Sequence, residues 1–213
     1  MTIAFLADDV LKNEIIEKGI SHSIELVWAD SVSSLLMLEA DAYFDLKFEM
    51  DKERTKRLGK LHPKPIFISA VNETLKQIGD EDFIRINAWP GMIKRSLIEL
   101  AFVEGKSGVA KKVFDEIGWH YATTADIEGF ITPRIIAMII NEAYFALGEG
   151  VSTKTEIDIA MKAGTNYPYG PFEWAEKIGL KNILALLISL YRNNTRYKPA
   201  LMLSAELAYD LSD

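Results

Sequence analysis

The sequence predicts two domains, an α/β domain with a mainly parallel sheet followed by an all-helical domain. In the first half of the chain, short runs rich in β-branched and aromatic residues alternate with helical patterns. Strands separated by helices of about ten residues are typical of βαβ crossovers and a doubly wound sheet. From Thr132 onward, every apolar pattern has helical spacing. We therefore expect one domain at residues 1–125 and a second at residues 126–213.

In the first domain, the expected strands lie at residues 2–7, 24–28, 42–46, 66–71, 83–88, 97–102 and 119–123. The spacing of apolar residues predicts helices between them, at residues 9–19, 31–39, 52–61 and 109–117.

The second domain is expected to be built around one long helix. Proline is tolerated in the first turn of a helix, so Pro133 indicates a helix start. The following run to Leu147 is apolar almost all round, which predicts a buried helix. Four more helices are expected after it, at residues 153–164, from Pro171, at 181–193 and from Pro199.

The composition excludes several kinds of site. The chain has 213 residues, a net charge of −7, no cysteine and three histidines, so we expect no disulfide and no metal site. The negative charge argues against nucleic-acid binding, and the basic residues between Lys52 and Lys64 are interpreted as a solvated helix face. Neither a signal peptide nor an apolar run long enough to span a membrane is recognisable, so we expect a soluble cytoplasmic protein.

Five short motifs after residue 128 resemble, in order and spacing, the carboxy-terminal domain of 3-hydroxyacyl-CoA dehydrogenases. They are Gly129-Phe130-Ile131 with Arg134, Asn141-Glu142-Ala143, Glu149-Gly150-Val151, Glu156-Ile157-Asp158, and Tyr167 to Glu173. The resemblance implies a shortened Rossmann-like NAD-binding domain before this helical domain, CoA-ester ligands, and a homodimer through helices 133–148 and 199–211.

The cofactor turn departs from the family pattern. A dinucleotide-binding turn needs glycines, because the backbone must approach the pyrophosphate at a helix N-terminus. The resemblance places the three glycine positions on Ala7, Asp9 and Lys12, and the ribose-binding carboxylate on Asp30. Carboxylates here would repel a pyrophosphate, so we expect no ordinary NAD binding and expect Asp8 or Asp9 to cap the first helix.

The catalytic positions also differ from the family pattern. The resemblance implies that Glu99 is the carboxylate that orients the catalytic base and that Asn87 stands at the position of that base, a histidine. An asparagine side chain cannot accept the hydroxyl proton. Thr74 matches the substrate-binding serine, with the register uncertain by one residue, and Pro133 falls on the family's asparagine. His120 is interpreted as structural.

Other family features are absent or structural. Ala40 to Asp45 resembles a family strand, but the long helical arm that helps to hold CoA in the family is missing before it. We interpret Asn141 and Glu142 as a satisfied buried polar pair, because unpaired burial would be costly. The aromatic residues between Tyr167 and Phe172 are interpreted as a packing corner in preference to a ligand cleft.

Two functions remain open from the sequence. The first is a family member that has lost hydride transfer and serves as a binding or assembly module, for an acyl-CoA-like ligand or for another protein. The alternative is an enzyme, still a 3-hydroxyacyl-CoA dehydrogenase or another CoA-ester oxidoreductase, with a rearranged site using Glu99, Asn87 and Thr74. A third reading is a subunit whose site is completed by a partner chain.

Overall fold

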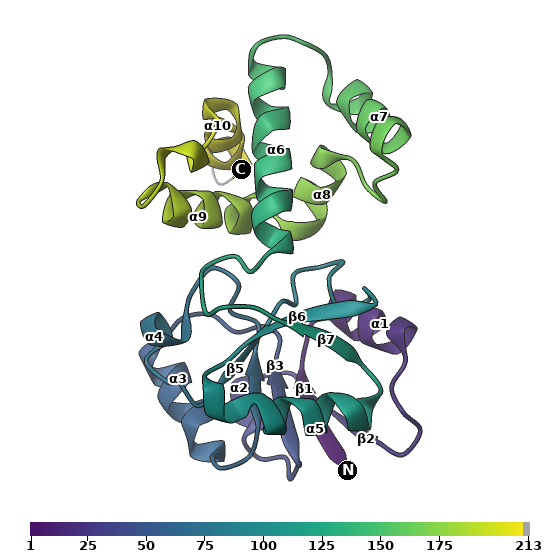
Figure 1. Ribbon diagram of the computed structural model, residues 1–213, viewed down its shortest axis with the longest axis vertical. Helices are drawn as coiled ribbons and strands as arrows, with labels where there is room; N and C mark the ends of the chain where they lie inside the picture. The colour runs from purple at the N-terminus through teal and green to yellow at the C-terminus, as the bar shows by residue number, and fades with distance from the viewer. Residues whose placement is uncertain (211–213) are drawn as a thin grey trace. The chain divides into compact units, whose positions relative to one another are not determined.

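The computed structural model describes residues 1–210 and contains an α/β unit and a helical unit (Figure 1). The chain divides into these two compact units between Phe130 and Ile131. The predicted fold class, a mostly parallel sheet followed by a helical region, is confirmed.

One seven-stranded sheet organises the first unit, in the order β2-β1-β3-β4-β5-β6-β7. The strands are β1 (Thr2–Leu6), β2 (Glu25–Ala29), β3 (Ala42–Asp45), β4 (Ile66–Ile68), β5 (Ile84–Ile86), β6 (Leu97–Ala101) and β7 (His120–Thr123). The first five strands run parallel to one another, and β6 and β7 run parallel to each other but opposite to the rest.

Helices cover both faces of this sheet, because successive strand residues point to opposite faces. On one face, Ile3 and Phe5 of β1 share a core with α1 (Asp9–Lys18) and α5 (Ser107–Ile117). On the other face, Ala4 and Leu6 pack with α2 (Val32–Leu35), α3 (Lys52–Leu58) and α4 (Leu75–Ile78). The domain is therefore doubly wound, as the alternating pattern predicts.

The sequence-based prediction missed two features of this unit. The ten-residue connection 87–96 between β5 and β6 contains no helix, and β6 pairs antiparallel with β5. Parallel neighbours need a long crossover, which this connection does not provide. The short helix α4 was also not expected; Thr74 and Gln77 form a capping box that starts it, and Gly79 in a left-handed conformation ends it.

A buried arginine ties two loops to the end of β5. Arg85 is fully buried, and its guanidinium donates to the carbonyl oxygens of Ala70, Val71 and Ile127. It also donates to the Asp126 carboxylate at 2.6 Å. Asp126 in turn accepts the backbone N–H of Leu75, the first residue of α4. One charge therefore holds the β4–α4 loop and the segment before the helical unit together.

The helical unit contains the five predicted helices, and three of them pack against the first. They are α6 (Thr132–Gly148), α7 (Lys154–Thr165), α8 (Pro171–Ile178), α9 (Leu180–Tyr191) and α10 (Leu201–Asp210). Helix α6 contacts α8, α9 and α10, and buries Ile136, Ala137 and Ile140 among them, whereas α7 packs against α8. Exposed apolar residues on α6, such as Ile135 at 54 %, show that only one side of this helix is buried.

Two polar contacts fix the order of helices in this unit. Buried Asn141 donates to the carbonyl of Lys198 at 2.9 Å and accepts from the N–H of Ala200 at 2.8 Å, which joins α6 to the start of α10. The carboxylate of Asp158 accepts the first N–H groups of α8, from Phe172 and Glu173. A Cβ on Gly170 would lie 2.3 Å from that carboxyl group, so only glycine fits there.

The interpretation of Asn141 and Glu142 as a buried polar pair is right for Asn141 and wrong for Glu142. The carboxylate of Glu142 lies on the exposed side of α6. Side chains of adjacent helical residues point about 100° apart, so a helix with one buried side does not bury Asn141 and Glu142 together. Among residues 1–210, no helix has both the length and the apolar composition needed to cross a bilayer.

Replacement of Arg85 by methionine should destabilise the first unit. The half-buried carboxylate of Asp126 and three carbonyl groups would each lose a hydrogen-bond donor. Breaking a buried ion pair costs about 3 kcal/mol or more, and we expect the lower end because Asp126 keeps some contact with water. Urea unfolding measures the change. The exposed Lys112→Met variant is the control, and an equal loss of stability in both variants would contradict this role of Arg85.

Candidate cofactor and catalytic site

The expected site residues of the first unit gather at one edge of the sheet. Ligands of open α/β sheets bind outside the carboxyl ends of the strands, where the strand order reverses. In this sheet the reversal lies between β1 and β3, because β1 pairs with β2 on one side and with β3 on the other. Ala7 and Asp30 follow the carboxyl ends of β1 and β2, and Asn87 follows the carboxyl end of β5.

The turn after β1 is closed by its own side chains. Asp8 is the N-cap of α1, and its carboxylate accepts the N–H of Leu11 at 2.9 Å, which confirms the expected cap. Ala7 is buried, whereas Asp9 is exposed in the first turn. The N-terminus of α1, where a pyrophosphate would need free N–H groups, therefore already carries a carboxylate on its cap and a second one beside it.

Lys12 and Asp30, which the resemblance places in the cofactor site, contact each other. The Lys12 ammonium lies 3.7 Å from the Asp30 carboxylate and 5.9 Å from the centre of the Trp28 ring. The Asp30 side chain is 93 % exposed, so this ion pair adds little to stability. The ion pair matters for the site, because the Asp30 carboxylate, which is expected to bind ribose hydroxyls, already has a cationic partner.

A buried ion pair lies directly at the point where the strand order reverses. Asp45 ends β3 opposite Leu6, and its fully buried carboxylate accepts two hydrogen bonds from Arg54, at 2.7 and 2.9 Å. Burial raises the pKa of Asp45, and the Arg54 guanidinium offsets part of that rise. Arg54 also donates to the carbonyl of Lys47. Arg54, one of the residues interpreted as a solvated basic face, is instead partly buried in this pair.

The two residues at the expected catalytic positions form one hydrogen-bonded pair. Asn87 Nδ2 donates to Glu99 Oε2 at 2.8 Å, and the backbone N–H of Asn87 donates to the Glu99 carbonyl at 3.0 Å. The Asn87 carbonyl oxygen Oδ1 accepts the N–H of Trp89 at 3.4 Å. Antiparallel pairing of β5 with β6 places these residues side by side, and both are buried.

This pair can hold hydrogen bonds but lacks a proton acceptor at the position of the base. An amide neither ionises nor accepts a proton near neutral pH. The contact between positions 87 and 99 is the one that the family resemblance leads us to expect between a base and the carboxylate that orients it, with an amide at the position of the base.

The remaining expected residues are used for structure. The Thr74 hydroxyl accepts the N–H of Gln77 as the N-cap of α4. Pro133 is in the first turn of α6, and His120 is exposed in β7, opposite Leu97 of β6. In the helical unit, the Tyr169 ring packs edge-on against Trp174, and Phe172 packs in the same way against Tyr144. These ring contacts agree with the interpretation of that loop as a packing corner.

Sequence reasoning missed two charged groups in the loop after β4 and in β5. Arg85 interrupts an apolar strand, and a lone arginine in such a run is the signal that was available. Glu73 is partly buried in the loop after β4, and burial raises its pKa while the positive charge of Arg85 acts in the opposite direction. The short sequence SAVNETL, which resembles the family's serine segment, contains this carboxylate one residue before Thr74.

Replacement of Asn87 by aspartate should make stability fall as the pH rises. The new carboxyl group would contact Glu99, and two adjacent carboxylates share one proton, which raises the pKa of the pair. The folded variant then holds a proton that the unfolded chain loses above its ordinary pKa of about 4, so stability falls as the pH rises through that value.

Urea unfolding at pH 4 and pH 8 measures this effect. We expect the free energy of unfolding of Asn87→Asp to fall below that of the wild type by about 2 kcal/mol more at pH 8 than at pH 4. The exposed Asn193→Asp variant should show no such pH dependence. A deficit that is equal at both pH values would mean that positions 87 and 99 are not in contact.

Comparison with known proteins shows which family this chain resembles. Residues 129–208 match the family model for the 3-hydroxyacyl-CoA dehydrogenase carboxy-terminal domain. A 3-hydroxyadipyl-CoA dehydrogenase of Escherichia coli is 39 % identical over 110 residues, which is 50 % of this chain and 23 % of that protein. A 3-hydroxybutyryl-CoA dehydrogenase of Bradyrhizobium diazoefficiens is 29 % identical over 93 % of this chain and 73 % of its own length. The chain thus spans less than a quarter of the first relative.

The fold of both units is also found in a solved structure. An (S)-3-hydroxybutyryl-CoA dehydrogenase from Ralstonia eutropha superposes with a TM-score of 0.73 over 98 % of this chain and 94 % of the other, at 21 % identity. That identity supports a shared fold and no more. Residues 129–208 therefore belong to the 3-hydroxyacyl-CoA dehydrogenase carboxy-terminal domain family, and the chain as a whole resembles 3-hydroxyacyl-CoA dehydrogenases.

Proposed function

We propose that this chain has lost hydride transfer and serves as a binding or assembly module, for an acyl-CoA-like ligand or for a protein that acts on such ligands. The observation that carries the proposal is the buried hydrogen bond from Asn87 to Glu99 at 2.8 Å. Oxidation of an alcohol to a ketone needs a group that accepts the hydroxyl proton, and a positioned base is worth roughly two to four orders of magnitude in rate. Asn87 cannot be that group.

The arrangement of charges at the cofactor turn supports the same proposal. NAD is the cofactor that family membership suggests, and its pyrophosphate would meet the carboxylates of Asp8 and Asp9 at the start of α1. Neighbouring negative charges repel one another when no cation lies between them. The Lys12 ammonium does not fill that role, because it lies near Asp30 at the end of β2.

An acyl-CoA-like ligand is suggested by the relatives, whose names are those of 3-hydroxyadipyl-CoA and 3-hydroxybutyryl-CoA dehydrogenases. The matching residues of this chain concentrate in the helical unit, at 129–208. A module that has kept this unit and changed the cofactor turn is expected to bind a ligand or a partner without a redox reaction.

One observation favours the enzymatic alternative. The contact between positions 87 and 99 is retained, so an enzyme with a rearranged site needs only a different proton acceptor in reach. Glu99, Asn87 and Thr74 are the residues of such a site. A buried carboxyl group with a raised pKa is one way to supply a base near neutral pH, and Glu73 has a raised pKa in the loop next to Thr74.

Calorimetric titration with NADH and, separately, with acetoacetyl-CoA distinguishes these functions. We expect no binding of NADH at concentrations up to about 1 mM, where even an affinity of about −4 kcal/mol would be detected. Binding of acetoacetyl-CoA alone would support a ligand-binding module, and no heat from either would support an assembly role. Micromolar binding of NADH would contradict the proposal and favour the enzymatic alternative.

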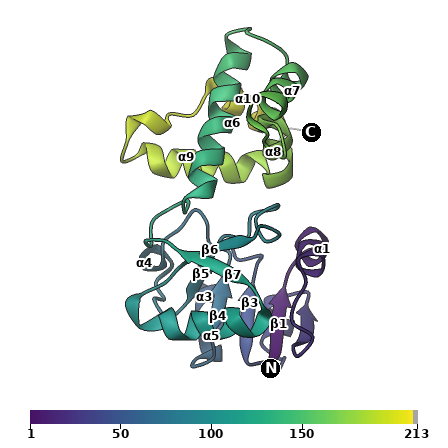
Figure 2. The same ribbon diagram turned by 45° about the vertical axis from the view of Figure 1, so that its right-hand side comes forward.

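We also propose that the protein is a cytoplasmic homodimer that associates through α6 and α10. These helices lie side by side (Figure 2), with Gly148 so close to Met202 that a Cβ on the glycine would lie 3.0 Å from that side chain. Their outer sides carry exposed apolar residues, among them Ile135 at 54 %, Leu201 at 83 % and Met202 at 44 %. Apolar surface of this kind is often buried by association.

Light scattering after gel filtration tests the dimer. The expected mass is about twice that of one chain, which is 24.0 kDa. A lysine at Leu201 should lower the mass to that of one chain, because it places a charge in an apolar interface. The Lys111→Ala variant, which changes an exposed residue of the first unit, should leave the mass unchanged. A wild-type mass of one chain would contradict the dimer.

A further inference from the structure

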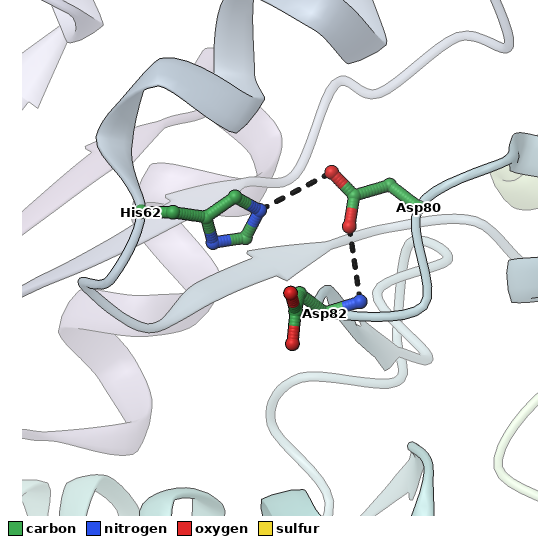
Figure 3. Close-up of side chains that lie close together, drawn as sticks. All are labelled: His62, Asp80 and Asp82. Carbon is green, nitrogen blue, oxygen red and sulfur yellow. Dashed lines mark hydrogen bonds and ion pairs between the residues drawn. The ribbon is translucent and has the colours of Figure 1, made fainter.

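We propose that His62, Asp80 and Asp82 form a binding site for a divalent transition-metal ion of the Zn²⁺ class. One ligand atom of each residue lies within 4.8 Å of the ligand atoms of the other two. Figure 3 shows the imidazole ring and the two carboxyl groups approaching one another from two loops. The site is independent of the proposed function, since none of these residues belongs to the cofactor or catalytic positions.

The distances suit a small ion with nitrogen and oxygen ligands. His62 Nε2 lies 3.2 Å from Asp80 Oδ2. Zinc binds imidazole nitrogen and carboxylate oxygen at about 2.0–2.2 Å, so two ligands of a tetrahedral site lie about 3.3 Å apart. An imidazole also favours zinc, cobalt or nickel over magnesium or calcium, which prefer oxygen ligands alone.

The ligand groups are held in place by the surrounding structure. Asp80 Oδ1 accepts the backbone N–H of Asp82 at 3.0 Å, which fixes the carboxylate so that Oδ2 is directed to His62 (Figure 3). The His62 ring stacks on Phe83, with ring centres 5.7 Å apart. Such secondary contacts are typical of metal sites, because they orient the ligands before the metal binds.

A lysine already neutralises part of the negative charge of the two aspartates in this cluster. The Lys106 ammonium forms an ion pair with Asp82 Oδ1 and lowers the pKa of that carboxyl group. A metal ion bound to Asp82 would compete with this ammonium group. Removal of the Lys106 charge should therefore tighten metal binding. Removal of a positive charge far from the cluster should not have this effect.

The position of the cluster indicates a structural role for the ion. His62 follows the 3₁₀ helix Gly59–Leu61 and precedes β4, while Asp80 and Asp82 precede β5. These are the amino ends of two parallel strands, and Asn87 lies after the carboxyl end of β5. A metal ion here would join the loop before β4 to the loop before β5, at the edge of the sheet opposite the candidate catalytic residues.

Zinc titration by calorimetry, after treatment with a chelator and removal of the chelator, tests the site. We expect about one ion per chain with a dissociation constant below about 10 µM. His62→Ala and Asp82→Asn should weaken binding at least about tenfold, and Lys106→Met should tighten it. Asp82 is suited to this test because its side chain is 62 % exposed, so its replacement should not disturb folding.

Two controls separate this site from adventitious binding. His22 is an exposed histidine outside this cluster, and His22→Ala should bind zinc like the wild type. Zinc should also raise the melting temperature of the wild type by several degrees but not that of His62→Ala, because a ligand stabilises only the state that binds it. Absence of saturable binding, or equal affinity in His62→Ala and wild type, would overturn the proposal, as would weaker binding in Lys106→Met.

Discussion

The carboxyl edge of the sheet depends on one buried charge. Arg85 lies in a strand that is apolar on both sides, and its guanidinium donates hydrogen bonds to Asp126 and to carbonyl groups of two loops. Burial of a charge is costly unless it is paired and fully hydrogen-bonded, so these loops cannot move independently. Through Asp126 the same charge holds the start of α4, and the Phe130 ring packs against it with its centre 4.6 Å from the guanidinium carbon. A rigid frame results, on which the candidate site is placed.

Within this frame, side chains pair with one another at the positions where the family resemblance leads us to expect cofactor and substrate. Asp8 caps α1, Lys12 pairs with Asp30, and Asp45 pairs with Arg54 at the reversal of strand order. At the end of β5, the Asn87 amide binds the Glu99 carboxylate. Each of these contacts gives a polar group a partner within the chain. The helical unit, by contrast, keeps the polar contacts that define its packing, such as those of Asn141 and Asp158.

Most of the fold is predictable from the sequence, because hydrophobic periodicity and capping residues act locally. The capping box at Thr153, the proline at the start of α6 and the cap at Asp8 all predict helix starts that the structure contains. The direction of β6 was not predicted, since it depends on a connection without a helix. In the candidate site, the family register brings Asn87 and Glu99 to positions that are in contact. The pairs of Arg54, Arg85 and His62 join residues distant in sequence, and no local pattern specifies them.

The direct test of lost hydride transfer is the oxidation of NADH in the presence of acetoacetyl-CoA, followed by absorbance with the wild type and with Glu99→Gln. If Asn87 leaves the site without a base, neither protein should oxidise NADH faster than the reaction without protein. Turnover by the wild type that disappears in Glu99→Gln would contradict the loss of hydride transfer, and would show that the Glu99 carboxylate in β6 still takes part in catalysis.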